Sequence, residues 1–244
     1  MAERNQDSLP ILQLLPNAVT ILALCAGLTA IRFVMLGQLG LAAALIVVAA
    51  VLDALDGTLA RRLDAASTLG AELDSLSDFL AFGVAPGLIM YRFALMGNEG
   101  LGWMFVLVYA ICACLRLARF NVNRDLPPPS GKPHFIGVPA PGGALLALLP
   151  IFASQVGLFD AASYPLPCGL YLALVGLLMA SRVPTPSSKA LRIPRDKAAF
   201  ALVGLAFVVG MAVARFWLLM FTVTTLYAIV IAVAVLRHAV RRPR

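Results

Sequence analysis

The chain has 244 residues, of which 61% are hydrophobic and 13% charged, and its mean hydropathy is +0.92. A soluble core of this size does not need so much apolar sequence, so the composition excludes an ordinary water-soluble domain and indicates a polytopic membrane protein. The net charge of +7 does not indicate nucleic-acid binding, because the basic residues gather in short loops and at the C-terminus, as in proteins whose membrane helices are oriented by charge.

Apolar segments along the chain approach the roughly 20 residues that a helix needs to span a bilayer. We expect an all-α protein with about eight transmembrane helices, near 17–36, 39–62, 67–95, 101–122, 138–158, 163–182, 197–215 and 217–236. Pro86 predicts a kink in the third helix, and Pro165 and Pro167 suit the first turn of the sixth. This transmembrane domain (17–236) would follow an N-terminal cytoplasmic or interfacial segment (1–16) and precede a basic C-terminal tail (237–244).

The basic residues also predict an orientation. If both termini are cytoplasmic, sixteen of the nineteen Lys and Arg residues lie inside, and only Arg32, Arg92 and Arg215 lie outside. Membrane proteins show this bias towards positive charge on the cytoplasmic side. We therefore expect an integral protein of the cell (inner) membrane with an even number of spans. The cytoplasmic ends of the second and third helices would then carry the segment from Asp53 to Asp78.

That segment holds six of the twelve acidic residues, and four of them, Asp53, Asp56, Asp74 and Asp78, lie inside or beside apolar sequence at helical spacing. Carboxylates in such surroundings are costly unless they are paired or bind cations, so they indicate a functional site. Helical spacing places two sets on single helix faces: Asp53, Asp56, Gly57 and Ala60 on the second helix, and Ser67, Gly70, Asp74 and Asp78 on the third. A hairpin of these helices could aim four carboxylates into one cleft. The alternative is that they are ordinary charges at helix ends.

Carboxylate oxygens suit Mg²⁺ or Mn²⁺, and two ions could share the four acids. Such a site favours phosphoryl chemistry, in which the metal offsets the charge of a diphosphate and a carboxylate deprotonates an attacking hydroxyl. Gly57 and Gly70 would let a ligand or a partner helix approach the backbone closely, and Arg61 could hold a phosphate.

These residues resemble a known family. The pattern Asp53-x2-Asp56-Gly57-x2-Ala60-Arg61-x8-Gly70-x3-Asp74-x3-Asp78 matches the signature of the CDP-alcohol phosphotransferases at every fixed position. The resemblance implies a six-helix transmembrane core that joins an alcohol to the phosphoryl group of a CDP-linked substrate and releases CMP. It also implies site roles: metal binding by Asp53, Asp56, Asp74 and Asp78, general-base catalysis by Asp78, and CDP binding by Gly57, Ala60, Arg61, Ser67 and Gly70.

Four further stretches look like the phosphatidylserine synthase branch of that family, of the integral-membrane type. They are Leu15-Pro16-Asn17-x2-Thr20, Gly70-Ala71-Glu72-Leu73-Asp74-Ser75-Leu76, Arg116-Leu117-Ala118-Arg119-Phe120-Asn121 and Phe135-Ile136-Gly137-Val138-Pro139-Ala140-Pro141. This resemblance covers about residues 10–155, with Val138 where Leu is expected. It implies that CDP-diacylglycerol and L-serine give phosphatidylserine and CMP, and that the enzyme is a homodimer in membrane lipid. The C-terminal third resembles nothing specific and is expected to pack as helices.

The acceptor site is less determined. Arg116 and Arg119 lie at i and i+3 and could bind the acceptor's carboxylate or a lipid phosphate, or they could simply be cytoplasmic anchors. Asn121 and Lys132 are further candidates. The alternatives are another acceptor (glycerol 3-phosphate, inositol or choline), an Asp-rich intramembrane prenyltransferase, and a transporter. A prenyltransferase usually divides its acids between two halves of the chain, and a transporter favours internal repeats with charges at the midplane.

Overall fold

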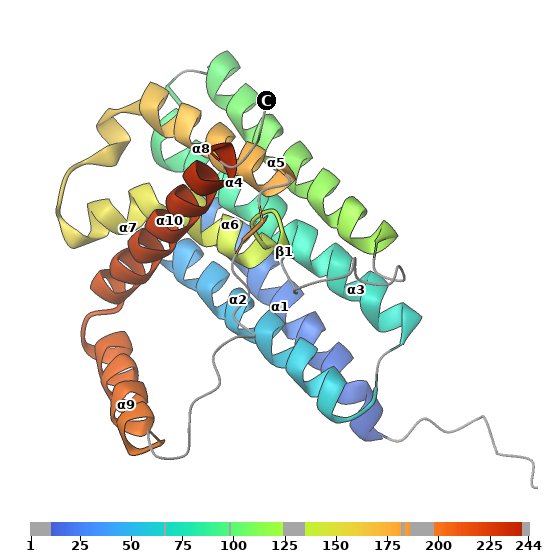
Figure 1. Ribbon diagram of the computed structural model, residues 1–244. Coiled ribbons are helices and arrows are strands. Elements are labelled where there is room, and N and C mark those ends of the chain that lie inside the picture. The colour runs from blue at the N-terminus through green and yellow to red at the C-terminus, as the bar shows by residue number, and fades with distance from the viewer. Residues whose placement is uncertain are drawn as a thin grey trace, which may run out of the picture.

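The computed structural model describes residues 11–65, 67–97, 99–123, 135–181, 184–185 and 198–240. These residues form a bundle of helices, so the expected all-α class is confirmed (Figure 1). The first half holds α1 (Ile11–Met35), α2 (Leu39–Arg62), α3 (Thr68–Asp78), η1 (Phe79–Val84), α4 (Ala85–Met90), η2 (Tyr91–Leu95) and α5 (Glu99–Val122). The second half holds α6 (Ala140–Ala147), α7 (Leu149–Val156), η3 (Ala161–Ser163), α8 (Pro165–Ala180), α9 (Ala198–Ala214) and α10 (Phe216–Val240). A two-residue antiparallel pairing joins β1 (Phe135–Ile136) to β2 (Pro184–Thr185).

Five helical stretches in the described part are long and apolar enough to cross a membrane: Leu14–Met35, Leu39–Arg62, Thr68–Leu95, Gly100–Val122 and Phe216–Arg237. The segment expected as one helix over 138–158 instead forms α6 and α7, which meet at Leu148. Pro150 lies in the first turn of α7, where it lacks the N–H that would continue the α6 ladder. The expected count of eight spans therefore stays a prediction.

The first helix also differs from its expected bounds. It begins at Ile11 rather than at residue 17 and runs through Pro16 without a break. It packs along α2. Most of the buried hydrophobic residues of these two helices are alanines, whose small side chains let membrane helices approach closely: Ala23, Ala26 and Ala30 of α1 and Ala42, Ala43 and Ala49 of α2. The close packing brings α1 beside the acidic end of α2.

A π-helical turn lies just before Pro86, where the sequence predicts a kink. Residues Phe79–Val84 are π-helical, and Pro86 lies in the first turn of α4, which follows. A proline leaves the preceding turn without one backbone hydrogen bond, and a wider turn is one way to absorb the mismatch. Tyr109 of α5 donates a hydrogen bond to the Phe82 carbonyl oxygen (2.7 Å), which ties α5 to the π-helical turn.

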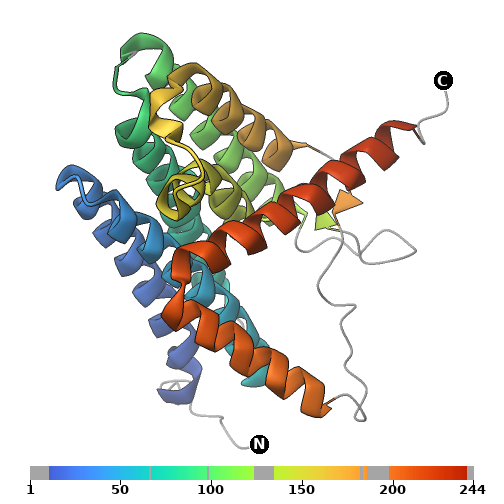
Figure 2. The same ribbon diagram turned by 90° about the vertical axis from the view of Figure 1, so that its left-hand side faces the viewer.

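On the other side of the bundle α5 packs along α8 (Figure 1). Gly176 allows this approach, because a Cβ at that position would lie 2.9 Å from the Cα of Tyr109. As expected, α8 begins at Pro165. Figure 2 shows α10 crossing the bundle, where it contacts α6 and α7, while α9 joins the rest of the chain mainly through α10.

Candidate active site

The turn between α2 and α3 fixes how the two acidic helix faces meet. Helix α2 ends in a Schellman motif: Asp64 is left-handed (φ 49°), and the Ala65 N–H bonds to the Ala60 carbonyl (3.1 Å). Ser67 then caps α3, because its hydroxyl accepts a hydrogen bond from the Gly70 N–H (3.0 Å). Both ends of this short connection are thus set by local hydrogen bonds, which hold α2 and α3 in one register.

The hairpin brings three carboxylates together. Oxygens of Asp53, Asp56 and Asp74 lie within 4.8 Å of one another. Asp56 is buried, with only 5% of its surface exposed, and it accepts a 2.7 Å hydrogen bond from the Thr20 hydroxyl. The same hydroxyl lies 3.1 Å from the Pro16 carbonyl oxygen of α1. Helix α1 therefore orients one of the three acids.

Asp78 joins this group from the end of α3. Its carboxyl group is in hydrogen-bonding contact with Asp53, and it also interacts electrostatically with Asp74. Two carboxyl groups in such contact need a shared proton or a cation between them. Arg116 of α5 interacts with both Asp53 and Asp78, so it supplies positive charge on this side. We call Asp53, Asp56, Asp74 and Asp78 the acidic cluster.

A pocket of about 310 Å³ opens beside the acidic cluster. Its walls combine charged, polar and small residues, and we call it the polar pocket. All five residues that the family resemblance assigned to CDP line it: Gly57, Ala60, Arg61, Ser67 and Gly70. Asp56 and Asp74 form the part of its wall that belongs to the acidic cluster. The polar pocket therefore brings the two predicted sets of residues into one site.

Helix α1 and the end of α5 add residues that the sequence analysis did not assign to the site. Pro16, Asn17 and Thr20 line the polar pocket, as does Phe120. Asn17 lies so close to Gly70 that a Cβ on Gly70 would be 2.6 Å from its Oδ1. A signal for these residues was available, because Pro16-Asn17-x2-Thr20 is one of the stretches that resemble the branch.

The structure separates the residues proposed for the acceptor. Arg116 faces the acidic cluster, and its buried Nε has no hydrogen-bond partner among the described residues. Arg119 instead donates a 2.8 Å hydrogen bond to the Ala180 carbonyl at the end of α8, which links two helices. Asn121 lines the polar pocket, and its Oδ1 lies 3.1 Å from the Ser75 hydroxyl. Lys132 lies outside the described residues.

The residues present fit divalent cations. The donors of the acidic cluster are all carboxylate oxygens, which Mg²⁺ and Mn²⁺ prefer. Asp53, Asp56 and Asp74 hold such oxygens close enough to share an ion, and Thr20 fixes the orientation of one of them. A hydrogen bond from a neighbouring side chain to a ligating carboxylate is typical of metal sites.

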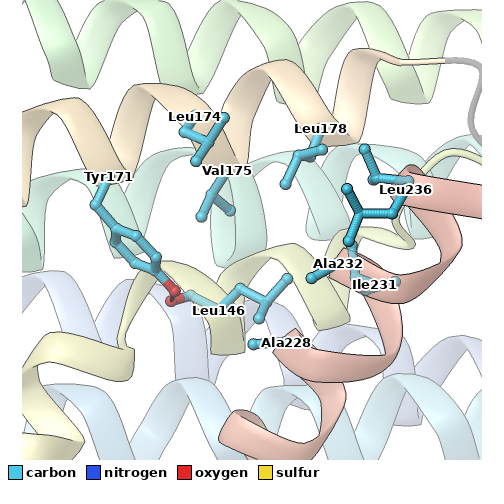
Figure 3. A pocket seen from close by; sticks show the side chains of 10 residues that line it. Leu146, Tyr171, Leu174, Val175, Leu178, Ala228, Ile231, Ala232 and Leu236 are labelled. Carbon is cyan, nitrogen blue, oxygen red and sulfur yellow. Dashed lines mark hydrogen bonds between the residues drawn. The ribbon is translucent and has the colours of Figure 1, made fainter. Parts of the chain in front are cut away.

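A second pocket of about 440 Å³ has a different character (Figure 3). It lies between α6, α8 and α10, and its walls are aliphatic apart from Tyr171. The Tyr171 hydroxyl donates a 2.7 Å hydrogen bond to the Leu146 carbonyl. Among the described residues, no titratable side chain other than this phenol lines this apolar pocket, so it lacks the acids and the arginine that line the polar pocket.

The fold and the site define a class: helical membrane proteins with a carboxylate cluster, fitted for divalent cations, inside the bundle. Comparison with known proteins narrows the class. A family model described as CDP-alcohol phosphatidyltransferase matches residues 13–181, which include the acidic cluster and the whole polar pocket. The chain belongs to the CDP-alcohol phosphatidyltransferase family.

Three relatives that match much of the chain are each named CDP-diacylglycerol–serine O-phosphatidyltransferase. That of Mycobacterium tuberculosis is 40% identical over 223 residues, which cover 88% of this chain and 76% of the relative. That of Bacillus subtilis is 34% identical over 175 residues, covering 72% of this chain and 91% of the relative. That of Helicobacter pylori is 33% identical over 178 residues, covering 73% of this chain and 74% of the relative.

Proposed function

We propose that this protein transfers the phosphatidyl group of CDP-diacylglycerol to the hydroxyl of L-serine, giving phosphatidylserine and CMP. The observation that carries the proposal is that two acids of the acidic cluster, Asp56 and Asp74, form part of the wall of the polar pocket. Relatives from three bacterial genera named for this reaction support it. The branch-specific stretches support serine over glycerol 3-phosphate, inositol or choline as the acceptor.

In this proposal the polar pocket binds the cytidine diphosphate end of the donor. The backbone is open at Gly57, where a Cβ would meet only the Arg61 side chain at 3.6 Å. Arg61 lies one turn further along α2 and is exposed, so its guanidinium can reach a phosphate oxygen. The acyl chains would extend from this site into the surrounding lipid.

The acidic cluster would hold one or two divalent ions, Mg²⁺ or Mn²⁺, through Asp53, Asp56, Asp74 and Asp78. When bound, these ions would offset the negative charge of the diphosphate and make its phosphorus more electrophilic. Asp78 would accept the proton of the serine hydroxyl as its oxygen attacks the phosphorus on the lipid side. CMP would leave from the polar pocket. Arg116, on the same side as Asp53 and Asp78, would bind the serine carboxylate.

The direct test is a product assay. Purified protein in detergent is given CDP-diacylglycerol, Mn²⁺ or Mg²⁺, and labelled serine, glycerol 3-phosphate, inositol or choline in parallel. We expect lipid product with serine alone, and none after EDTA treatment. A lipid product from another acceptor, in place of the serine product, would contradict the branch and leave the family chemistry intact.

We also propose that the chain lies in the cell (inner) membrane with eight spans and with both termini and the active site cytoplasmic. The distribution of Lys and Arg supports this orientation. Gly97 then lies outside, and Arg62 lies inside. A membrane-impermeant thiol reagent should label Gly97→Cys in intact cells and should miss Arg62→Cys until the cells are opened. The reverse pattern would invert the topology.

The homodimer implied by the family resemblance is tested by the mass of the detergent-solubilised protein.

Gly57→Ala tests the polar pocket without removing a charged group. The added methyl group would meet only the Arg61 side chain, at an ordinary contact distance of 3.6 Å, so the fold has room for it. Alanine also favours a helix interior over glycine by up to about 1 kcal/mol. We expect unchanged or higher thermal stability together with a KM for CDP-diacylglycerol at least about tenfold higher, since the methyl group occupies ligand space. An unchanged KM would show that the donor does not approach this backbone.

A further inference from the structure

The acidic cluster has two sides, and only one of them belongs to the polar pocket. Asp56 and Asp74 line that pocket, whereas Asp53, Asp78 and Arg116 are not among the residues that line it. Those three interact with one another. A donor bound in the polar pocket therefore leaves Asp53, Asp78 and Arg116 facing another direction, where the acceptor must enter if Asp78 is to take its proton.

Arg116 has unused hydrogen-bonding capacity on this side. Its Nε is one of three buried side-chain atoms in the described part of the chain that have no hydrogen-bond partner. The other two are the Oγ1 atoms of Thr224 and Thr225, both on α10. Buried polar atoms are nearly always hydrogen-bonded, so an atom without a partner indicates a water or a ligand that completes it.

Helix α10 brings a further polar group to the same place. Tyr227 lies one turn beyond Thr224 and interacts electrostatically with Arg116. Its ring rests on α6: a Cβ built on Gly142 would lie 2.8 Å from the phenol oxygen and 3.1 Å from the carbon that bears it. The contact of α10 with α6, seen where α10 crosses the bundle in Figure 2, therefore fixes this hydroxyl in place.

Together these groups are complementary to the carboxylate and the ammonium group of an amino acid. The Arg116 guanidinium interacts with two carboxyl groups, those of Asp53 and Asp78, and with the Tyr227 phenol, a second group that can donate a hydrogen bond. Serine is complementary to that arrangement, since it carries a carboxylate, an ammonium group and a hydroxyl. Inositol and choline carry no anionic group, so they offer this pair of donors only neutral hydroxyl oxygens, which bind a guanidinium more weakly than a carboxylate does.

We propose that Tyr227 is an acceptor-specificity residue whose hydroxyl, together with Arg116, holds the carboxylate of the amino-acid substrate opposite Asp53 and Asp78. The inference rests on the proposed function and extends it to a helix beyond the 13–181 region that matches the family model. It assigns to α10 a role in substrate choice as well as in packing.

Tyr227→Phe removes the hydroxyl alone. We expect the serine KM to rise about 10- to 150-fold, the range for one hydrogen bond to a charged group, while the KM for CDP-diacylglycerol changes less than about twofold. Tyr171→Phe is the matched control. It also removes a hydroxyl from a partly buried tyrosine, which donates to the Leu146 carbonyl and lines the apolar pocket (Figure 3), so serine kinetics should match the wild type.

Gly142→Ala provides a second variant that keeps the phenol but displaces it, because the new methyl group would crowd the Tyr227 ring. It should raise the serine KM in the same direction as Tyr227→Phe. A merely structural role for Tyr227 would lower thermal stability and affect both substrates equally, which overturns the inference. The inference is also overturned if Tyr227→Phe and Gly142→Ala both show wild-type serine kinetics in an assay where the wild type makes phosphatidylserine. If the wild type transfers to another acceptor instead of serine, the proposed function fails, and this inference fails with it.

Discussion

Asp56→Asn should reduce phosphatidyl transfer about 100-fold or more and weaken Mn²⁺ binding in parallel. Asp56 is the most deeply buried acid of the acidic cluster, and asparagine replaces one of its oxygens with a group that cannot bind a cation. Removing a residue that only hydrogen-bonds to a metal ligand already lowers metal affinity or activity by about 10- to 100-fold. Electron paramagnetic resonance of free and bound Mn²⁺ measures the affinity independently of turnover.

Two variants calibrate that result. Thr20→Val removes the hydroxyl that bonds to Asp56 and keeps the acid, so we expect a smaller loss of about 10- to 100-fold. Asp64→Asn makes the same chemical change in the same hairpin, but Asp64 is exposed and left-handed, a conformation that asparagine tolerates. It should behave like the wild type. If Asp56→Asn binds Mn²⁺ as tightly as Asp64→Asn does, Asp56 is not a ligand.

Asp78→Asn should lower kcat by about 10²- to 10⁴-fold, the usual contribution of a general base, and leave the KM for CDP-diacylglycerol within a few-fold of the wild type. Asparagine keeps the shape of the side chain and the contact with Asp53, but it cannot accept the serine proton. Glu72→Gln is the control, because Glu72 is an exposed acid on the same helix, outside the acidic cluster. Wild-type turnover in Asp78→Asn would require another base.

The acidic site could be predicted from sequence because its determinants are local. Asp53 and Asp56 share one helix face, Asp74 and Asp78 share the next, and the connection between them is short enough to force a hairpin. Its turn chemistry is local too, since Ser67 is three residues before the N–H that it caps. The periodicity and spacing of residues in the sequence are enough to predict such local features.

Contacts between distant segments were not predictable in this way. Thr20 meets Asp56 across 36 positions, and Arg119 meets Ala180 across 61. Arg116 and Arg119 share a helix face by spacing, yet one faces the acidic cluster and the other binds the end of α8. The surroundings of each arginine depend on which helix packs against that part of α5, and the sequence of residues 116–121 does not specify this packing. Tyr227 lies in the C-terminal third, which was expected only to pack as helices, because its sequence resembles nothing specific.

The π-helical turn has a consequence for how the third membrane-spanning stretch, Thr68–Leu95, is built. The π-helical turn begins at Phe79, directly after Asp78, and such turns are frequent at functional sites. A wider turn holds one more residue than an α-helical turn, so the stripe of residues that faces inward before it does not continue in phase after it. The acids before the turn can therefore point into the site while Ile89 and Met90, after the turn, are buried in the core. The residues before the turn thus contribute to the site and those after it pack in the core, and no loop is needed between the two parts.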